Sequence, residues 1–283
     1  MGFKTILVNL NHESRVAELV AAAAGAARPT EAHVVGLYVA PPLFMPSDVI
    51  MPMGADFYEQ QVSEHREQSE RIRTVFDRLT KGEPFVAEWK SKGNLAMAYE
   101  PIAGGVIAEA RAADLVVVSQ ATDGNDPPML TDVPQRVALE SGRPVLVVPT
   151  RWGGTQYGQK IAIAWNNSRE AARATFDALP FLERAKSVKL ITAGESRDSD
   201  GTPTISAADV AASLARHGLK VDVEAMPQIS GSIGPALLAS ATAAGADLLV
   251  MGAYGHSRMR EFILGGATRD VLKSMTVPVL MSH

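Results

Sequence analysis

Cysteine is absent from the 283-residue chain, and this absence excludes several kinds of chemistry together. Without cysteine there can be no disulfide bond, no thiolate nucleophile and no cysteine-based zinc site. The N-terminal residues enter an apolar strand pattern directly, with no basic segment, longer apolar run and cleavage site that would predict a signal peptide. No apolar stretch approaches the ~20 residues that a membrane helix needs. We therefore expect a cytoplasmic protein with no membrane partner.

Positive charge is also scarce, because 27 Lys and Arg face 31 Asp and Glu, which gives a net charge of -4. Nucleic-acid binding requires clustered basic residues, so no nucleic-acid partner is predicted. The six histidines show no spacing typical of metal ligands, and we predict no metal site in the protein itself. A P-loop motif is missing, and residues 165–168 (WNNS) stand where a dinucleotide-binding enzyme would carry its glycines.

What the sequence does contain is an internal repeat. Three segments of the first half match three segments of the second half in the same order: 5–11 with 160–166, 113–120 with 246–253, and 143–149 with 277–283. A repeated order of this kind predicts two copies of one domain in tandem. We place them at residues 1–150 and 158–283, joined by a short glycine-rich segment.

Each half alternates short β-branched runs with alanine-rich helical stretches. In the second half the expected strands are 160–165, 188–192, 220–225, 247–251 and 277–281, and the expected helices are 168–182, 207–217, 233–244 and 266–274. Ser168 and Ser206 are predicted helix N-caps. The apolar runs do not alternate with polar residues, which is typical of strands buried on both faces. The pattern therefore predicts an α/β protein with two tandem, doubly wound, five-stranded parallel sheets of Rossmann-like type.

The chemistry is concentrated after the fourth strand of the second half. Gly252 and Gly255 are separated by two residues, and nine residues then precede Gly265. Ligands of open α/β sheets bind beyond the carboxyl ends of the strands, and glycine there permits positive φ and close ligand approach. Gly265 and Gly266 begin the last helix, whose free N–H groups form an anion site. Arg258 lies between these glycines, and Thr268 adds a hydroxyl in the first turn.

This pattern resembles the universal stress protein family, whose motif is Gly, two residues, Gly, nine residues, Gly, then Ser or Thr. The resemblance covers essentially the whole chain as a tandem of two family domains, with an adenine nucleotide alpha hydrolase-like fold. It implies an adenine nucleotide, ATP, ADP or AMP, with or without Mg²⁺, held in the second half. The implied binding residues are Trp165, Asn166, Ala193, Gly252, Gly255, His256, Arg258, Gly265, Gly266, Ala267 and Thr268.

Two residues depart from the family pattern. Asn166 stands where the family commonly has Asp, so a neutral amide replaces a charged acceptor. Gly266 stands in place of the Ser or Thr, so one hydroxyl contact to phosphate is missing. We expect binding to survive, with a preference for shorter phosphate chains.

The first half lacks the glycine loop. Gln120 is followed by a segment with one glycine, acidic or amide side chains and two prolines, in which Asp123 and Asp126 would repel phosphate. We predict that this half does not bind nucleotide and instead covers the edge of its twin. It also carries a Met- and Pro-rich loop at 41–53 with no counterpart in the second half, which is interpreted either as a loop packed across the other domain or as an apolar lid.

Three functions stay open at this point. The first is a nucleotide-binding regulatory protein of the stress response, with an unknown protein partner and no catalytic residue. The second is a slow ATPase, for which no base near residues 252–268 can be named. The third is an interaction scaffold with a vestigial loop. The final strands of the halves, 145–148 and 277–282, are apolar edges that we expect to pair within the chain as a pseudo-dimer, with a homodimer as a further possibility.

Overall fold

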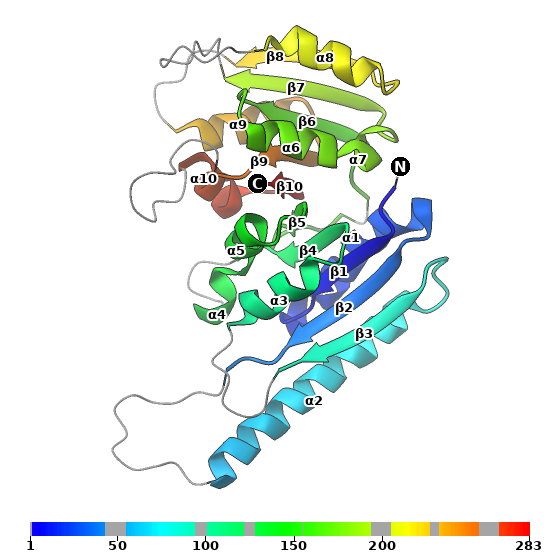
Figure 1. Cartoon of the computed structure of the whole chain (residues 1–283), viewed down its shortest axis with the longest axis vertical. Helices are drawn as coiled ribbons and strands as arrows, with labels where there is room; N and C mark the ends of the chain where they lie inside the picture. The colour runs from blue at the N-terminus through cyan, green and yellow to red at the C-terminus, as the bar shows by residue number, and fades with distance from the viewer. Residues whose placement is uncertain are drawn as a thin grey trace.

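The computed structural model describes residues 2–42, 55–93, 101–121, 128–154, 156–193, 205–226, 232–254 and 266–283. Each half contributes five strands to a single sheet (Figure 1). The strands of the first half are β1 (Thr5–Asn9), β2 (His33–Val39), β3 (Ala87–Lys92), β4 (Leu115–Ser119) and β5 (Val145–Val148). Those of the second half are β6 (Lys160–Trp165), β7 (Ser187–Ala193), β8 (Val221–Met226), β9 (Leu248–Gly252) and β10 (Val279–Ser282).

The strand order is β3-β2-β1-β4-β5-β10-β9-β6-β7-β8, so each half has the doubly wound order that the sequence predicts. Within each half the strands run parallel. The halves meet where β5 and β10 pair antiparallel, with Val147 opposite Val279 and Val145 opposite Met281. The predicted apolar edges therefore pair with each other, and one ten-stranded sheet results.

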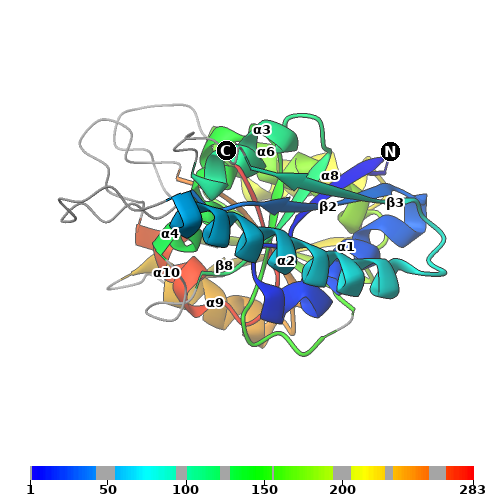
Figure 2. The same cartoon turned by 90° about the horizontal axis from the view of Figure 1, so that it is seen from below.

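Helices lie on both sides of this sheet, as the view at right angles shows (Figure 2). The first half contains the 3-10 turns η1 (Glu13–Arg15) and η2 (Arg28–Thr30) and the helices α1 (Val16–Ala27), α2 (Ala55–Thr80), α3 (Ile102–Ala110), α4 (Pro128–Thr131) and α5 (Val133–Glu140). The second half contains α6 (Arg169–Asp177), α7 (Leu179–Leu182), α8 (Ala207–Ala215), α9 (Ile233–Ala243) and α10 (Gly266–Ser274).

Two hydrophobic cores separate these helices into layers. One core joins the sheet to α1, α2, α6, α7 and α8, and the other joins it to α3, α5, α9 and α10. The strands at the junction contribute to both, because Val145–Val148 and Val279–Met281 are all 0% exposed. Each fully buried aliphatic side chain of this kind contributes roughly 1.5–3 kcal/mol, so the junction between the halves is part of the core.

Local sequence signals account for most element boundaries. Ser168 and Ser206 cap α6 and α8, each accepting a hydrogen bond at 3.1 Å from the backbone N–H three residues later. The predicted helix over 168–182 is wrong in one respect, since it divides into α6 and α7. Pro180 explains the division, because it lies in the first turn of α7 and has no N–H to continue the preceding helix.

The repeat is also visible in two equivalent aspartates at the start of β4 and β9. Asp114 accepts hydrogen bonds from the backbone N–H groups of Lys4 and Thr5 at 2.8 and 3.0 Å. Asp247 does the same for Gly158 and Lys160 at 2.8 and 3.0 Å. In each half the aspartate carboxylate therefore fixes the start of the central strand, β1 or β6, and acts as a structural cap.

The segment between the halves is packed against both of them. The hydroxyl of Tyr157 donates to the carbonyl of Ala22 in α1 at 2.7 Å. Its ring lies 5.9 Å from that of Trp152 and 5.7 Å from that of Phe181. β5 ends and β6 begins on either side of this segment, where the two predicted domains would join.

None of the helices that the structure describes has the length and apolar character that a membrane span requires.

Candidate functional site

A pocket of about 230 Å³ opens at the carboxyl ends of the strands in the second half. The chain leaves β6 for β7 and β8 on one side and returns to β9 on the other, so the strand order reverses between β6 and β9. Open α/β sheets bind their ligands at this reversal, because the helices leave a crevice there. The pocket is thus where the fold predicts a site.

The lining of this pocket is largely apolar, and the sequence analysis missed most of it. Side chains from β7, β8, β9 and α9 form its wall: Ile191, Met226, Ile233, Leu237 and Met251. They are ordinary core residues in type, and only their position at strand ends or at the start of a helix distinguishes them. An apolar wall with a few polar groups at one end is typical of small-molecule sites.

The N-terminus of α10 forms the polar end of the pocket. Gly266, Ala267 and Thr268, three of the predicted binding residues, line it. Gly266 is exposed, and a Cβ added there would meet nothing within 4 Å. The unpaired N–H groups of a helix start carry partial positive charge and can bind an anion. Among the described residues nothing covers the position of a Cβ on Gly266, and this end of the pocket is suited to negative charge.

Besides lining the pocket, Thr268 links two segments of the structure. Its hydroxyl oxygen accepts a hydrogen bond from the backbone N–H of Tyr254 at 3.3 Å, and its side chain is buried. Thr268 therefore ties the residues that follow β9 to the first turn of α10. The contact brings together two parts of the predicted loop that are 14 residues apart in the sequence.

Gly252 lines the pocket, but its lack of a side chain has a different reason from the one expected. It does not adopt a positive φ. A Cβ there would lie 2.5 Å from the backbone nitrogen of Ala171 and 2.6 Å from the carbonyl carbon of Glu170, at the start of α6. Glycine is required because helix α6 lies against the strand end, and the positive φ that glycine permits is not adopted at this position.

The three predicted residues at the ends of β6 and β7 lie in different positions relative to the pocket. Asn166 lines the pocket and is exposed, and its Oδ1 accepts a hydrogen bond from the N–H of Ser168 at 3.2 Å. Trp165 also borders the pocket, but its side chain belongs to the core beneath α6 and α8. Ala193 is the last residue of β7 and pairs with Met226 of β8; its side chain lies outside the described part of the structure.

Several other predicted residues fall outside the described residues. Gly255, His256, Arg258 and Gly265 lie in 255–265, and most of the 41–53 loop and the segment with Asp123 and Asp126 are likewise outside. Within the described ranges no group of three or more His, Asp or Glu side chains could hold a metal ion.

Tyr254 borders the pocket and has unusual surroundings. Its backbone is left-handed, with φ 64°, which is uncommon for an aromatic residue. Its hydroxyl is buried without a hydrogen-bond partner, and this burial raises the pKa of the phenol well above its usual value. The phenol therefore stays protonated at neutral pH. Trp165 Nε1 and Ser282 Oγ are also buried and unpartnered, and both lie at the ends of strands in this half.

The matching asparagine in the first half is buried and hydrogen-bonded to the neighbouring strand. Asn11 corresponds to Asn166 in the repeat and is 6% exposed. Its Nδ2 donates to the carbonyl of Val39 at 2.6 Å, and its Oδ1 accepts from the N–H of Val39 at 3.2 Å. Asn9 donates to the same Oδ1 at 2.7 Å. The backbone N–H and carbonyl of Val39, the last residue of β2, are therefore hydrogen-bonded within the first half. The equivalent strand of the second half, β7, ends at Ala193.

Comparison with known proteins supports the fold and the repeat. The model of the "Universal stress protein family" matches residues 159–283. Universal stress protein Slr1230 of Synechocystis is 28% identical over 148 residues, 52% of this chain and 49% of that protein, so the match spans about half the length of this relative.

Solved structures extend the likeness over both halves. A universal stress protein of Archaeoglobus fulgidus gives a TM-score of 0.70 at 17% identity and covers 98% of this chain and 95% of its own. A functionally unknown protein of Pseudomonas aeruginosa gives a TM-score of 0.56 at 15% identity, covering 99% and 92%. At these identities the likeness concerns the fold.

The fold and the pocket define a tandem, doubly wound α/β protein of Rossmann-like type with a crevice at one switch point. Residues 159–283 match the universal stress protein family, and the fold of both halves is similar to that of a solved universal stress protein.

Proposed function

We propose that this chain is a stress-response regulatory protein that binds an adenine nucleotide in its second half. The observation that carries the proposal is the pocket between β6, β9 and α10, which combines an apolar wall with an open helix N-terminus. A base and ribose would lie against Ile191, Met226 and Leu237, and the phosphates would lie toward Gly266. The matched family motif supports this assignment for Gly252, Gly255 and Gly265.

No carboxylate belongs to the described lining of the pocket. The described residues therefore do not form a Mg²⁺ site of their own, and a Mg²⁺ ion would enter with the nucleotide, held by its phosphates. The same lining contains no side chain suited to act as a general base. Binding that regulates a protein partner is therefore proposed rather than hydrolysis.

Isothermal titration of ligand-stripped protein with ATP, ADP and AMP tests the proposal. We expect one site per chain. Ala164→Leu, which adds three carbon atoms inside the pocket, should weaken binding at least about tenfold because the ligand and the new side chain compete for the same space. Ala225→Leu on β8 is the matched control, since Ala225 is exposed and does not line the pocket.

Absence of heat, thermal shift and competition with all three nucleotides would overturn the proposal. Appearance of ADP during incubation with ATP would instead favour the slow ATPase. The ranking of affinities tests the missing hydroxyl at Gly266: we expect AMP and ADP to bind more tightly than ATP, and three equal affinities would contradict the preference for shorter phosphate chains.

A further inference from the structure

The side chain of Gln120 links the first half to the helix that borders the pocket in the second half. Gln120 follows β4 and is 5% exposed. Its Nε2 donates to the carbonyl of Leu272 at 2.6 Å and to that of Lys273 at 3.3 Å. Both carbonyls belong to the last turn of α10, where helix carbonyls have no partner within the helix. A residue of one half thus caps a helix of the other.

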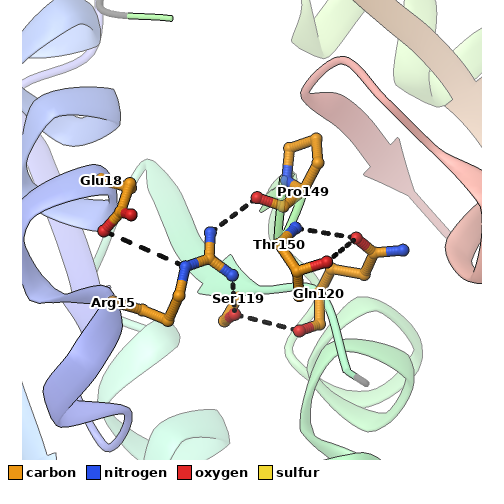
Figure 3. A network of polar contacts seen from close by, with 6 residues as sticks. All are labelled: Arg15, Glu18, Ser119, Gln120, Pro149 and Thr150. Carbon is orange, nitrogen blue, oxygen red and sulfur yellow. Dashed lines mark hydrogen bonds and ion pairs between the residues drawn. The ribbon is translucent and has the colours of Figure 1, made fainter. Parts of the chain in front are cut away.

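The opposite side of the same carboxamide is fixed by the first half. Gln120 Oε1 accepts hydrogen bonds from the N–H of Thr150 at 2.9 Å and from its hydroxyl at 3.3 Å (Figure 3). Because both ends of the amide are engaged, its flip state is determined: the NH₂ group must face α10. The carboxamide is therefore a rigid bridge between Thr150 and the end of α10.

A buried arginine holds the strands on which this bridge stands. Arg15 donates to Ser119 Oγ at 3.0 Å and to the carbonyl of Pro149 at 2.6 Å, which joins the ends of β4 and β5 (Figure 3). Ser119 in turn donates to the carbonyl of Gln120 at 3.0 Å. The guanidinium, which is always charged, makes these bonds stronger than neutral ones. The network fixes the backbone on both sides of the bridge.

Helix α10 is closely packed at its other end. A Cβ on Gly234 of α9 would lie 2.6 Å from the Cβ of Asp270 and 3.0 Å from the carbonyl oxygen of Ala267. α9 and α10 therefore meet with almost no space between them, near the pocket. A helix of nine residues is a rigid rod about 13 Å long. Because α10 is one rigid unit held by α9 near its start and by Gln120 at its end, release of its last turn would shift the position of its first turn.

We propose that Gln120 is a positioning residue for the ligand of the second half, and that the first half serves as the platform that holds α10 in place. The expected effect on ligand binding rests on the proposed nucleotide site, whereas the contacts of Gln120 do not depend on that site. It gives the half without a glycine loop a definite part in binding.

The test compares Gln120→Glu with Tyr157→Phe in the full chain. Glutamate has the same size and can still accept from Thr150, but it places an oxygen instead of two N–H donors against the carbonyls of α10, at the negative end of the helix dipole. Tyr157→Phe removes another hydrogen bond between the halves, to Ala22, that does not touch α10. Gln120→Met, which removes the donors without adding charge, replaces Gln120→Glu if the latter does not fold.

We expect Gln120→Glu to raise the Kd for AMP and ATP about tenfold, the effect of about 1.4 kcal/mol, and to speed hydrogen exchange of the backbone amides in 266–275. Tyr157→Phe should lower the melting temperature with the Kd and α10 exchange unchanged. Wild-type affinity in a folded Gln120 variant, or an equal loss of affinity in Tyr157→Phe, overturns the positioning role. Failure of the wild-type chain to bind any nucleotide overturns the proposed function instead, and unchanged α10 exchange in Gln120→Glu would then overturn the bridge as well.

Discussion

The two halves use equivalent positions in opposite ways. In the first half, Asn11 is buried and satisfies both backbone groups of Val39, whereas in the second half the matching Asn166 is exposed at the mouth of a pocket. Ser119 is bonded to Arg15 in the first half, whereas Gly252 takes the same place in the second and lies against α6. In the first half these polar groups are hydrogen-bonded to neighbouring residues, and in the second half the matching positions border a pocket.

This difference also appears in the polar groups that have no partner. Within the described ranges, three buried atoms without a hydrogen bond lie at the carboxyl edge of the second half: Trp165 Nε1, Tyr254 OH and Ser282 Oγ. The first half also has three such atoms, Arg15 Nε, Glu18 Oε2 and His33 Nε2, but each of these has an ion-pair partner. Leaving such an atom unsatisfied costs about 1–3 kcal/mol. Buried polar groups without hydrogen bonds are concentrated at functional sites, because a structure optimised only for stability would not retain them. We therefore expect the residues at the strand ends of the second half to lower the stability of the fold in favour of binding.

Exchanging the residues at the ends of β4 and β9 gives the largest expected effect. Gly252→Ser should destabilise the chain by about 3 kcal/mol, because the new Cβ would collide with backbone atoms of α6 that cannot move independently. Ser119→Gly removes the hydrogen bonds to Arg15 and to the carbonyl of Gln120 and should cost about 1–2 kcal/mol. Urea denaturation measures both values, and Gly153→Ser, where a Cβ meets nothing within 4 Å, is the control. Equal losses in both halves would contradict the asymmetry.

The paired asparagines provide the next test. Asn11→Ala leaves the N–H and the carbonyl of Val39 without their partner in a buried position, so we expect a loss of about 2 kcal/mol. Asn166→Ala removes a single exposed contact and should change stability by less than about 0.5 kcal/mol. The difference in urea midpoint between the two variants is the measurement. A substantial loss in Asn166→Ala would show that its side chain holds the fold as Asn11 does.

Much of this fold follows from local sequence signals. The strand 160–165 and the helix 266–274 have the predicted limits, and Ser168 and Ser206 cap their helices, because these features depend on nearby residues alone. The motif spacing led to the second half, where Gly252 and Gly266 line a pocket, and their binding role stays a prediction. Contacts between distant segments were not predictable in this way.

Two examples show why. Nothing near Gly252 in the sequence indicates that α6 packs against it, since the contact depends on how closely a helix approaches a strand end 80 residues away. Gln120 was interpreted only as the start of a loop without phosphate-binding residues. Its role follows from the antiparallel pairing of β5 with β10, which brings the end of α10 beside it. Packing between segments that are distant in the sequence decides both features, and a single sequence does not record it.

A third test concerns charge, since Arg15 and Glu170 occupy matching positions in the repeat. Burial alone would raise the pKa of Glu170, but a hydrogen bond from Arg169 at 2.5 Å and the charge of His283 lower it below the usual value. A depressed carboxyl pKa stabilises the folded state above the unfolded pKa, and this stabilisation is lost as the pH falls through the folded pKa. We expect Glu170→Gln to reduce stability at neutral pH, by less than Asn11→Ala does, and to flatten the loss of stability below pH 4.5.

Urea denaturation at neutral and acidic pH would measure this effect. Arg15 stays charged over the whole range, so its bonds to Ser119 and Pro149 should not weaken with acid. Substitution of Glu88 by Gln serves as the control, because this glutamate is more exposed, with 44% of its side chain accessible. A steep acid transition that persists in Glu170→Gln would show that the titrating group lies elsewhere.

The smallest expected effect concerns Gly266, where the second half departs from the family motif. Gly266→Ser restores the hydroxyl at the start of α10, and a Cβ there meets nothing within 4 Å, so the substitution introduces no clash. The hydroxyl would add one hydrogen bond to a phosphate oxygen, and we expect the Kd for ATP to fall about threefold. Adenosine, which carries no phosphate, should bind as before. Titration with both ligands separates a phosphate contact from a general effect on the helix, since tighter binding of adenosine would assign the gain to stabilisation of α10 and not to the anion site.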